Sequence, residues 1–216
     1  MALPNTNRPL VKICGITRAE DAAYASNSGA DFLGFIFVKN TPRYISPEEA
    51  AQISRKVTQP KYVGVFMNDE ADLINKISQT ANLSYIQLHG DESPEFCAMI
   101  KLPVIKAFRI KPGMSEDDII SLLSPYKNVA EYVLLDAWDA NAAGGTGLRF
   151  DWNSAAKIHA SFKMFLAGGI NPQNADEAVR LVQPAGVDVS SGVEESPGIK
   201  NHGKIKSLVE AVRKAR

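Results

Sequence analysis

Eight short apolar segments alternate with longer segments of helical spacing, and this alternation restricts the fold of the chain more than any other feature. The apolar segments are continuous runs, which is typical of parallel strands buried on both faces. They are residues 10–14, 31–37, 62–66, 85–89, 104–110, 132–137, 163–170 and 186–193. The helical segments that follow them are residues 18–29, 46–57, 69–82, 93–101, 115–126, 151–160, 171–182 and 202–215. Such alternation, with right-handed crossovers, predicts an α/β protein with a parallel sheet.

The number of strand–helix units favours a closed sheet. Eight units in 216 residues predict a single-domain (β/α)8 TIM barrel. The alternative is an open doubly wound sheet, which usually carries its glycine-rich loop after the first strand. Here the glycine-rich loops follow the sixth, seventh and eighth strands, which favours the barrel. Because no linker or low-complexity tract divides the chain, we expect residues 1–216 to form one domain.

Charge and cysteine content exclude several classes of protein. Lys and Arg number 24, as do Asp and Glu, so neither nucleic acid nor an anionic membrane is the expected partner. The two cysteines, Cys14 and Cys97, are too few for a disulfide framework, and the three histidines lack the spacing of metal ligands. No signal core or membrane-length apolar run is present. We therefore expect a cytoplasmic protein without a metal, most simply a monomer, with a homodimer as the alternative.

Polar side chains gather where the predicted strands end. In a (β/α)8 barrel the active site lies at the carboxyl ends of the strands, so these side chains are expected on one rim. They include Lys12, Cys14, Arg43, His89 and Asp136. Packing can explain each residue alone, but it explains the whole set less well.

Three glycine-containing loops predict a phosphate site on that rim. They are residues 144–147 (GGTG), 167–170 (AGGI) and 190–192 (SSG). Glycine lets backbone N–H groups approach an anion closely, and serine adds hydroxyl donors. Phosphate sites after the seventh and eighth strands recur in this fold. The alternative is that the glycines only form tight turns. This explanation is less convincing for three adjacent loops than for one.

An acid and a base are suggested by Asp136 and Cys14. Asp136 closes an apolar strand, where partial burial would raise its pKa and suit it to act as a general acid. Lys12 lies two residues before Cys14 and therefore on the same face of the strand, where its charge would favour the thiolate. Taken alone, Cys14 is more often an inert core residue.

Arg43 and His89 are candidate site residues only because they lie on the same predicted rim. Arg43 follows the second strand, and its guanidinium suits a carboxylate ligand, although a solvated surface arginine is the simpler interpretation. His89 ends the fourth strand, where a structural hydrogen bond is commoner than a functional role.

Together these motifs resemble the phosphoribosylanthranilate isomerase family, the (β/α)8 enzymes of tryptophan biosynthesis. The resemblance runs over nearly the whole chain. It is carried by KICGI, DFLGFIF with PRYIS, VGVF, IQLHGDE, LLDA, GGTGLRFDW, LAGGINPQN and GVDVSSGVEESPGIKN. It implies an aldose–ketose isomerase that needs no cofactor. The family converts the aminoaldose N-(5-phosphoribosyl)anthranilate to the aminoketose 1-(2-carboxyphenylamino)-1-deoxyribulose 5-phosphate by an Amadori rearrangement.

The resemblance also implies a role for individual residues. Asp136 matches the general acid that opens the furanose ring, and Cys14 matches the general base that removes the C2 proton. Arg43 matches the arginine that holds the anthranilate carboxylate, and we place Lys12 and His89 among the substrate-binding residues. The residues that fall in the phosphate-binding loops are Gly145, Gly147, Gly168, Gly169, Ser191 and Gly192.

Other functions remain open at the level of the sequence. The chain lacks the Lys and Glu set of indoleglycerol-phosphate synthase and the paired carboxylates with histidine ligands of a sugar-phosphate epimerase. A non-catalytic phosphosugar-binding barrel is a third possibility, against which Cys14 and Asp136 argue. A fourth is dual specificity with the related histidine-pathway isomerase, which relies on two aspartates.

Overall fold

A computed structural model describes residues 8–137 and 151–215, and strands β1 to β8 close into a barrel in the order of the sequence. Every neighbouring pair is parallel, and β8 pairs with β1. The strands are β1 (Leu10–Cys14), β2 (Phe32–Ile36), β3 (Lys61–Phe66), β4 (Tyr85–Leu88), β5 (Val104–Ile110), β6 (Tyr132–Ala137), β7 (Met164–Leu166) and β8 (Gly186–Val189). The predicted (β/α)8 barrel is confirmed, and the open sheet is excluded.

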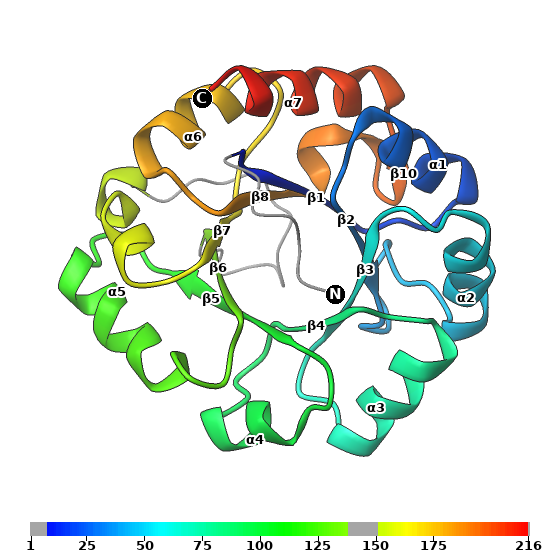
Figure 1. Ribbon diagram of the computed structural model, residues 1–216, viewed down its shortest axis with the longest axis horizontal. Coiled ribbons are helices and arrows are strands. Elements are labelled where there is room, and N and C mark those ends of the chain that lie inside the picture. Colours follow the sequence, from blue (N-terminus) through cyan, green and yellow to red (C-terminus); the bar gives the residue numbers. More distant parts are fainter. Residues whose placement is uncertain (1–7, 138–150, 216) are drawn as a thin grey trace.

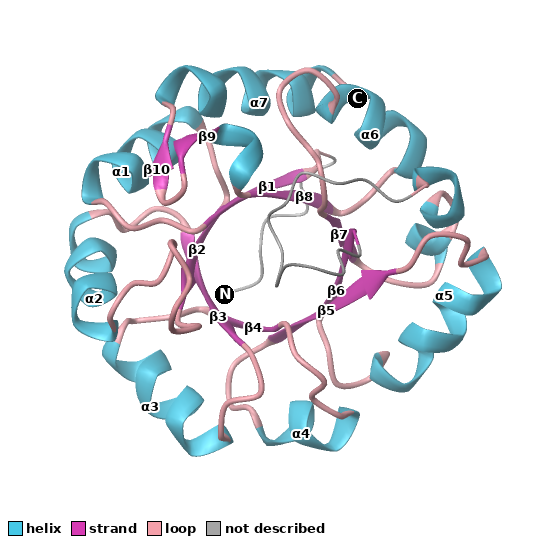
Figure 2. Cartoon of the chain, turned by 180° about the vertical axis from the view of Figure 1, so that it is seen from behind, coloured by secondary structure: helices cyan, strands magenta, loops and turns pink. Residues whose placement is uncertain are grey.

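A ring of helices surrounds the barrel (Figures 1 and 2). The α-helices are α1 (Ala19–Ser28), α2 (Pro47–Lys56), α3 (Ala71–Thr80), α4 (Pro94–Met99), α5 (Glu116–Leu123), α6 (Ala175–Val182) and α7 (His202–Lys214). Short polar sequences fix where several of them begin. In α2 the Ser46 hydroxyl accepts a hydrogen bond from the Glu49 N–H at 3.2 Å, and the Glu49 carboxylate accepts one from the Ser46 N–H at 3.0 Å. This reciprocal cap satisfies two N–H groups that the helix cannot satisfy internally.

One predicted helix is wrong in type. Residues 151–160 form two 3-10 helices, η2 (Trp152–Ala155) and η3 (Ile158–Ala160), instead of one α-helix. Polar side chains at the start of this segment bond to nearby groups: the Ser154 hydroxyl donates to the Asp151 carbonyl at 2.7 Å, and the Asn153 amide donates to the Asp151 carboxylate at 2.8 Å. Such local bonds compete with the α-helical pattern and favour tight turns.

Two apolar layers hold the barrel together. The larger one lies between the strands and the helices. The smaller one fills the inside of the barrel, where the Phe32 ring lies 5.3 Å from Tyr85 and 5.6 Å from Phe165 between ring centroids. Phe32, Tyr85 and Tyr132 are the first residues of their strands, so this cluster closes the amino-terminal end of the barrel. The interior near the carboxyl ends is thereby left to polar side chains.

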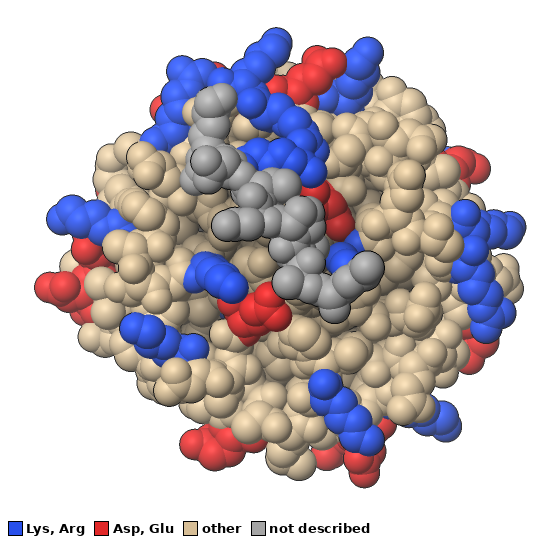
Figure 3. All heavy atoms as spheres, viewed as in Figure 1, with Lys and Arg blue, Asp and Glu red and all other residues tan. Residues whose placement is uncertain are grey.

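The surface carries both signs of charge. On the face shown in Figure 3, basic and acidic side chains both lie around the periphery, in line with 24 residues of each sign. In the part of the chain that the structure describes, no helix is both long enough and apolar enough to cross a bilayer.

Candidate active site

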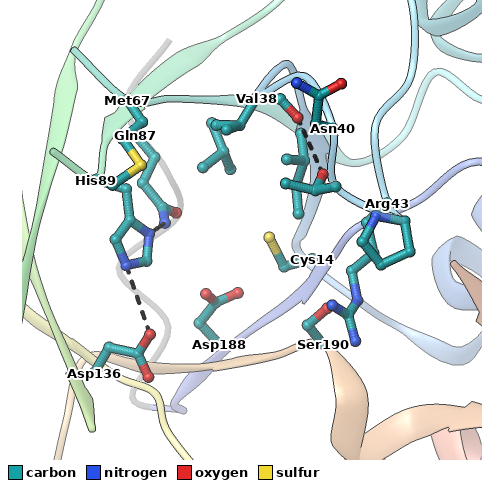
Figure 4. A pocket seen from close by; sticks show the side chains of 14 residues that line it. Cys14, Val38, Asn40, Arg43, Met67, Gln87, His89, Asp136, Asp188 and Ser190 are labelled. Atoms are coloured by element: carbon teal, nitrogen blue, oxygen red, sulfur yellow. Dashed lines mark hydrogen bonds and ion pairs between the residues drawn. The ribbon is translucent and has the colours of Figure 1, made fainter. Parts of the chain in front are cut away.

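A cavity of about 420 Å³ opens at the carboxyl ends of the strands. Cys14, Arg43, His89 and Asp136 all line it, so four residues from distant parts of the sequence face one space (Figure 4). In Figure 4, His89 and Asp136 lie on one side of the cavity and Arg43 lies on the other, with Cys14 between them. Alternate residues along each strand point into the barrel, which is why strand ends deliver these side chains together.

Lys12 lies inside the barrel, next to Cys14, and is completely buried. Its Nζ lies 2.8 Å from Oδ1 of Asp188, the residue directly opposite it on β8. Burial would lower the pKa of Lys12, but Asp188 and Cys14 outweigh this effect and raise the pKa. A charged lysine therefore lies inside the barrel.

Burial also has the largest effect on the pKa of Cys14, which is 5% exposed. Burial raises the pKa of the thiol, while Lys12 and Lys200 lower it only in part. The sequence-based expectation that Lys12 favours the thiolate has the correct sign for Lys12 itself. The net pKa of Cys14 is nevertheless above its usual range, because the thiolate loses more hydration than the lysines restore.

Asp136 and His89 form a second polar pair. Oδ1 of Asp136 accepts a hydrogen bond from the Ala137 N–H at 2.9 Å, and Oδ2 lies 3.6 Å from Nε2 of His89. Nδ1 of His89 lies 3.1 Å from the side-chain nitrogen of Gln87, which can only donate. His89 therefore lies between Gln87 and Asp136, with one ring nitrogen facing each of them.

Arg43 does not extend freely into solvent, as the simpler interpretation of the sequence assumed. Its Nε lies 2.9 Å from Oε1 of Glu194 and its Nη2 lies 2.7 Å from Oε2, which is a bidentate ion pair. Gly15, with φ of 74°, passes close beneath it, since a Cβ on Gly15 would lie 2.8 Å from Cδ of Arg43. Residues other than glycine are disfavoured at position 15 for two reasons: the positive φ, and the lack of space for a Cβ next to Arg43.

The loops after β7 and β8 meet beside this cavity. Gly168 and Gly169 have φ of 78° and 70°, and a Cβ on Gly168 would lie 3.1 Å from Oδ1 of Asp136. A Cβ on Gly192 would overlap the Ile170 carbonyl oxygen. The two loops therefore depend on glycine for their contact with each other. Ser191 begins η4 (Ser191–Val193) in the second loop.

Three residues that contact the site were not predicted from the sequence, and two predicted residues are not described. Gly145 and Gly147 lie outside the described residues. Asp188, Glu194 and Lys200 were not singled out from the sequence. Counting back in twos from the last residues of the eighth strand would have placed Asp188 inside the barrel. No comparable signal exists for the residues of the hairpin formed by β9 (Glu194–Ser196) and β10 (Ile199–Lys200).

Comparison with known proteins agrees with the fold. Residues 11–211 match the family model described as N-(5'phosphoribosyl)anthranilate (PRA) isomerase. The N-(5'-phosphoribosyl)anthranilate isomerase of Citrifermentans bemidjiense is 46% identical over 205 residues, which are 94% of this chain and 97% of that protein. That of Geobacter sulfurreducens is 44% identical over 208 residues, covering 94% of this chain and 98% of its own.

Solved structures give the same result. The crystal structure of phosphoribosyl anthranilate isomerase from Thermotoga maritima has a TM-score of 0.87 at 38% identity, covering 95% of this chain and 99% of its own. A phosphoribosyl anthranilate isomerase in complex with reduced 1-(o-carboxyphenylamino)-1-deoxyribulose 5-phosphate has a TM-score of 0.84 at 38% identity, with the same coverage. The resemblance predicted from the motifs is confirmed: the chain belongs to the N-(5'-phosphoribosyl)anthranilate isomerase family.

Proposed function

We propose that this barrel isomerises N-(5'-phosphoribosyl)anthranilate by general acid–base catalysis, with Asp136 as the acid and Cys14 as the base. The observation that carries the proposal is their placement around one cavity with Arg43. Asp136 protonates the furanose ring oxygen, and the ring opens to an iminium ion. The Cys14 thiolate then removes the C2 proton to give an enolamine, which tautomerises to the ketone. The iminium nitrogen is the electron sink, so the acid and the base suffice.

The cavity suits a substrate with an anion at each end. Arg43 supplies a guanidinium for the anthranilate carboxylate, and the apolar side chains of Ile36, Val38 and Val65 line the same cavity and suit the aromatic ring. The loops that contain Gly168, Gly169, Ser191 and Gly192 would hold the phosphate through backbone N–H groups, which glycine leaves open to the close approach of an anion. Binding energy from both anions then orients the sugar between acid and base.

Lys12 and His89 would support this chemistry from beside the acid and the base. The buried ammonium of Lys12 lies next to Cys14 and stabilises the thiolate when it forms. Nε2 of His89 faces Asp136, and the imidazole would help to bind the hydroxyl groups of the sugar. The variants Lys12→Met and His89→Asn test these two roles.

The loss of anthranilate-type fluorescence from freshly prepared substrate tests the reaction. Cys14→Ser and Asp136→Asn should each lower kcat by about 10²–10⁴-fold, which is the usual contribution of one positioned acid or base. Cys97→Ser is the matched control, because Cys97 is equally buried but lies in α4, outside the cavity. Full turnover in Cys14→Ser or Asp136→Asn would refute the assignment.

We also propose that the protein acts as a cytoplasmic monomer. The few large apolar side chains that are exposed among the described residues favour the monomer. A relative from Thermotoga maritima is described as dimeric, so light scattering at micromolar concentration is the relevant measurement. A mass of twice 23.5 kDa would contradict the monomer.

A further inference from the structure

We propose that Glu194 is a positioning residue that orients Arg43 toward the carboxylate of the substrate, and that Lys200 preserves the positive charge needed there. The inference rests on the proposed role of Arg43. A guanidinium has two edges that can each hold a carboxylate. Glu194 occupies the edge made by Nε and Nη2. Among the described residues, none accepts a hydrogen bond from Nη1 of Arg43. Arg43 is one of the residues that line the cavity.

Glu194 is itself rigidly held. It is 7% exposed, and its Oε1 lies 2.8 Å from Nζ of Lys200 and 3.3 Å from the Gly198 N–H. Burial would raise the pKa of Glu194, but Arg43 and Lys200 outweigh it and keep the pKa below its usual range. The carboxylate therefore stays ionised and holds the arginine side chain in one orientation, which lowers the entropy lost on ligand binding.

Lys200 adds a positive charge beside the Arg43–Glu194 pair and so affects how strongly the pair attracts a carboxylate. An Arg–Glu pair alone has no net charge, so it offers an incoming carboxylate little attraction. Lys200 is 2% exposed, and its Nζ donates to the carbonyl oxygens of Cys14 and Ser190 as well as to Glu194. Burial lowers the pKa of Lys200, and Glu194 and Cys14 oppose this shift only in part. The three acceptors around Nζ match the three N–H donors of the charged ammonium. With Arg43, Glu194 and Lys200 all ionised, the cluster carries one net positive charge.

The same lysine ties this cluster to the base. Its contact with the Cys14 carbonyl fixes the end of β1, and its contact with Ser190 fixes the end of β8. The carboxylate-binding arginine and the proposed base are therefore supported by one buried ammonium. This arrangement predicts that Glu194 controls recognition of the carboxylate, whereas it makes no contact with the reacting carbon atoms.

Two stable ligands separate these effects. The first is the reduced product analogue 1-(o-carboxyphenylamino)-1-deoxyribitol 5-phosphate, and the second is its phenylamino counterpart without the carboxylate. Titration calorimetry gives the ratio of their Kd values, which we call the carboxylate preference. Glu194→Gln should lower this preference at least about tenfold, because it removes one partner of a buried charge pair. Its Kd for the ligand without the carboxylate should change less than about threefold, and kcat at saturation should change little.

A matched control exists on the opposite side of the barrel. Glu92 forms a similarly buried ion pair with Lys106, at 3.1 Å, and neither of them contacts Arg43. Glu92→Gln should cost stability but keep the carboxylate preference. Should Glu194→Gln fail to fold, Glu194→Asp keeps the charge but shortens the reach to Arg43, and it should lower the preference in the same direction.

The outcomes distinguish Glu194 from Arg43. Arg43→Ala should abolish the preference, and the Arg43→Ala/Glu194→Gln double variant should lose nothing further, because Glu194 acts through Arg43. Equal weakening of both ligands in Glu194→Gln would mean a purely structural role, and tighter binding of the carboxylated ligand would mean that Glu194 competes with it. Either result overturns the inference and leaves the proposed role of Arg43 intact. If Arg43→Ala kept the preference, the role of Arg43 itself would fail, and this inference with it.

Discussion

At the scale of single residues, the environment of Cys14 decides how this site can work. The thiol is buried with Lys12 and Asp188 near it, and burial has the larger effect on its pKa. A thiol with a raised pKa is mostly protonated at neutral pH, but the thiolate that does form is a strong base. Activity should therefore depend on pH through Cys14.

The first prediction concerns this pH dependence. A base must lose its proton before it acts, so a raised pKa means that kcat/KM increases as the pH rises above 7, toward and beyond the usual thiol value of about 8.5. In Cys14→Asp the same limb should move to lower pH, because a carboxyl ionises more readily than a thiol. Steady-state rates across a pH series measure both profiles. An identical limb in the two proteins would assign it to another group.

The second prediction concerns Gly34, which lies opposite Cys14 on β2. A Cβ at this position would lie 2.8 Å from Sγ of Cys14 and 3.3 Å from Nζ of Lys12. Gly34→Ala should therefore displace the thiol and lower kcat/KM by about 10²-fold, the usual effect of a misplacement near 1 Å. Gly203→Ala, in the first turn of α7, is the control and should retain activity. An active Gly34→Ala enzyme would show that the exact position of the thiol is unimportant.

At the scale of elements, Asp21 joins three segments that are far apart in the sequence. It lies on α1 and is fully buried, and its carboxylate accepts hydrogen bonds from Arg18 at 2.8 and 2.9 Å. It also accepts from the Lys200 N–H on β10 at 3.1 Å and contacts Nε2 of His202 on α7 at 2.9 Å. Burial would raise the pKa of Asp21, but these partners outweigh it and lower the pKa.

The third prediction follows from that lowered pKa. A carboxyl whose folded pKa is below its unfolded value of about 3.9 stabilises the protein above that pH and loses this effect as the pH falls through the folded pKa. Asp21→Asn should therefore lower the free energy of unfolding by about 2 kcal/mol at pH 7, with a smaller difference at pH 3. Urea unfolding at both pH values measures the difference.

An exposed carboxylate provides the comparison for Asp21. Asp117→Asn, in the first turn of α5, should change stability by less than about 0.5 kcal/mol at either pH. If the loss in Asp21→Asn were the same at pH 7 and pH 3, the ionised carboxylate would not be its cause.

At the scale of the whole molecule, the apolar cluster inside the barrel fills the end opposite to the site. Phe165 is fully buried and lies 5.1 Å from Tyr132 and 5.6 Å from Phe32 between ring centroids. These rings come from β2, β6 and β7, so they join opposite sides of the closed sheet. Closure leaves no free strand edge, and each strand depends on both of its neighbours.

The fourth prediction tests this dependence. Phe165→Ala should lower the free energy of unfolding by about 3–5 kcal/mol, because it leaves a cavity inside the barrel. Leu73→Ala, at a side chain on α3 that is 45% exposed, should cost much less. Chemical denaturation measures both values. A small loss in Phe165→Ala would mean that the interior repacks readily and contributes little to closure.

The strands and most helices follow from patterns that the sequence displays locally. The predicted strand 10–14 coincides with β1, and the predicted helix 46–57 contains α2. Residues 151–160 were predicted incorrectly because spacing alone does not distinguish an α-helix from 3-10 turns that are favoured by side-chain bonds to the backbone. Glu194 was missed because its partner Arg43 is 151 residues away, and nothing near either residue indicates the other.

The sequence by itself determined the order of the eight barrel strands and the type of most elements. With them it determined the rim on which Cys14, Arg43, His89 and Asp136 lie, because strand periodicity and strand ends are local properties. Only the tertiary structure decided their partners. Closure of β8 on β1 sets Lys12 against Asp188 across 176 residues of sequence. It also buries Cys14 deeply enough for desolvation to outweigh the lysines. Burial and long-range ion pairs depend on the whole closed barrel, so no local pattern contains them.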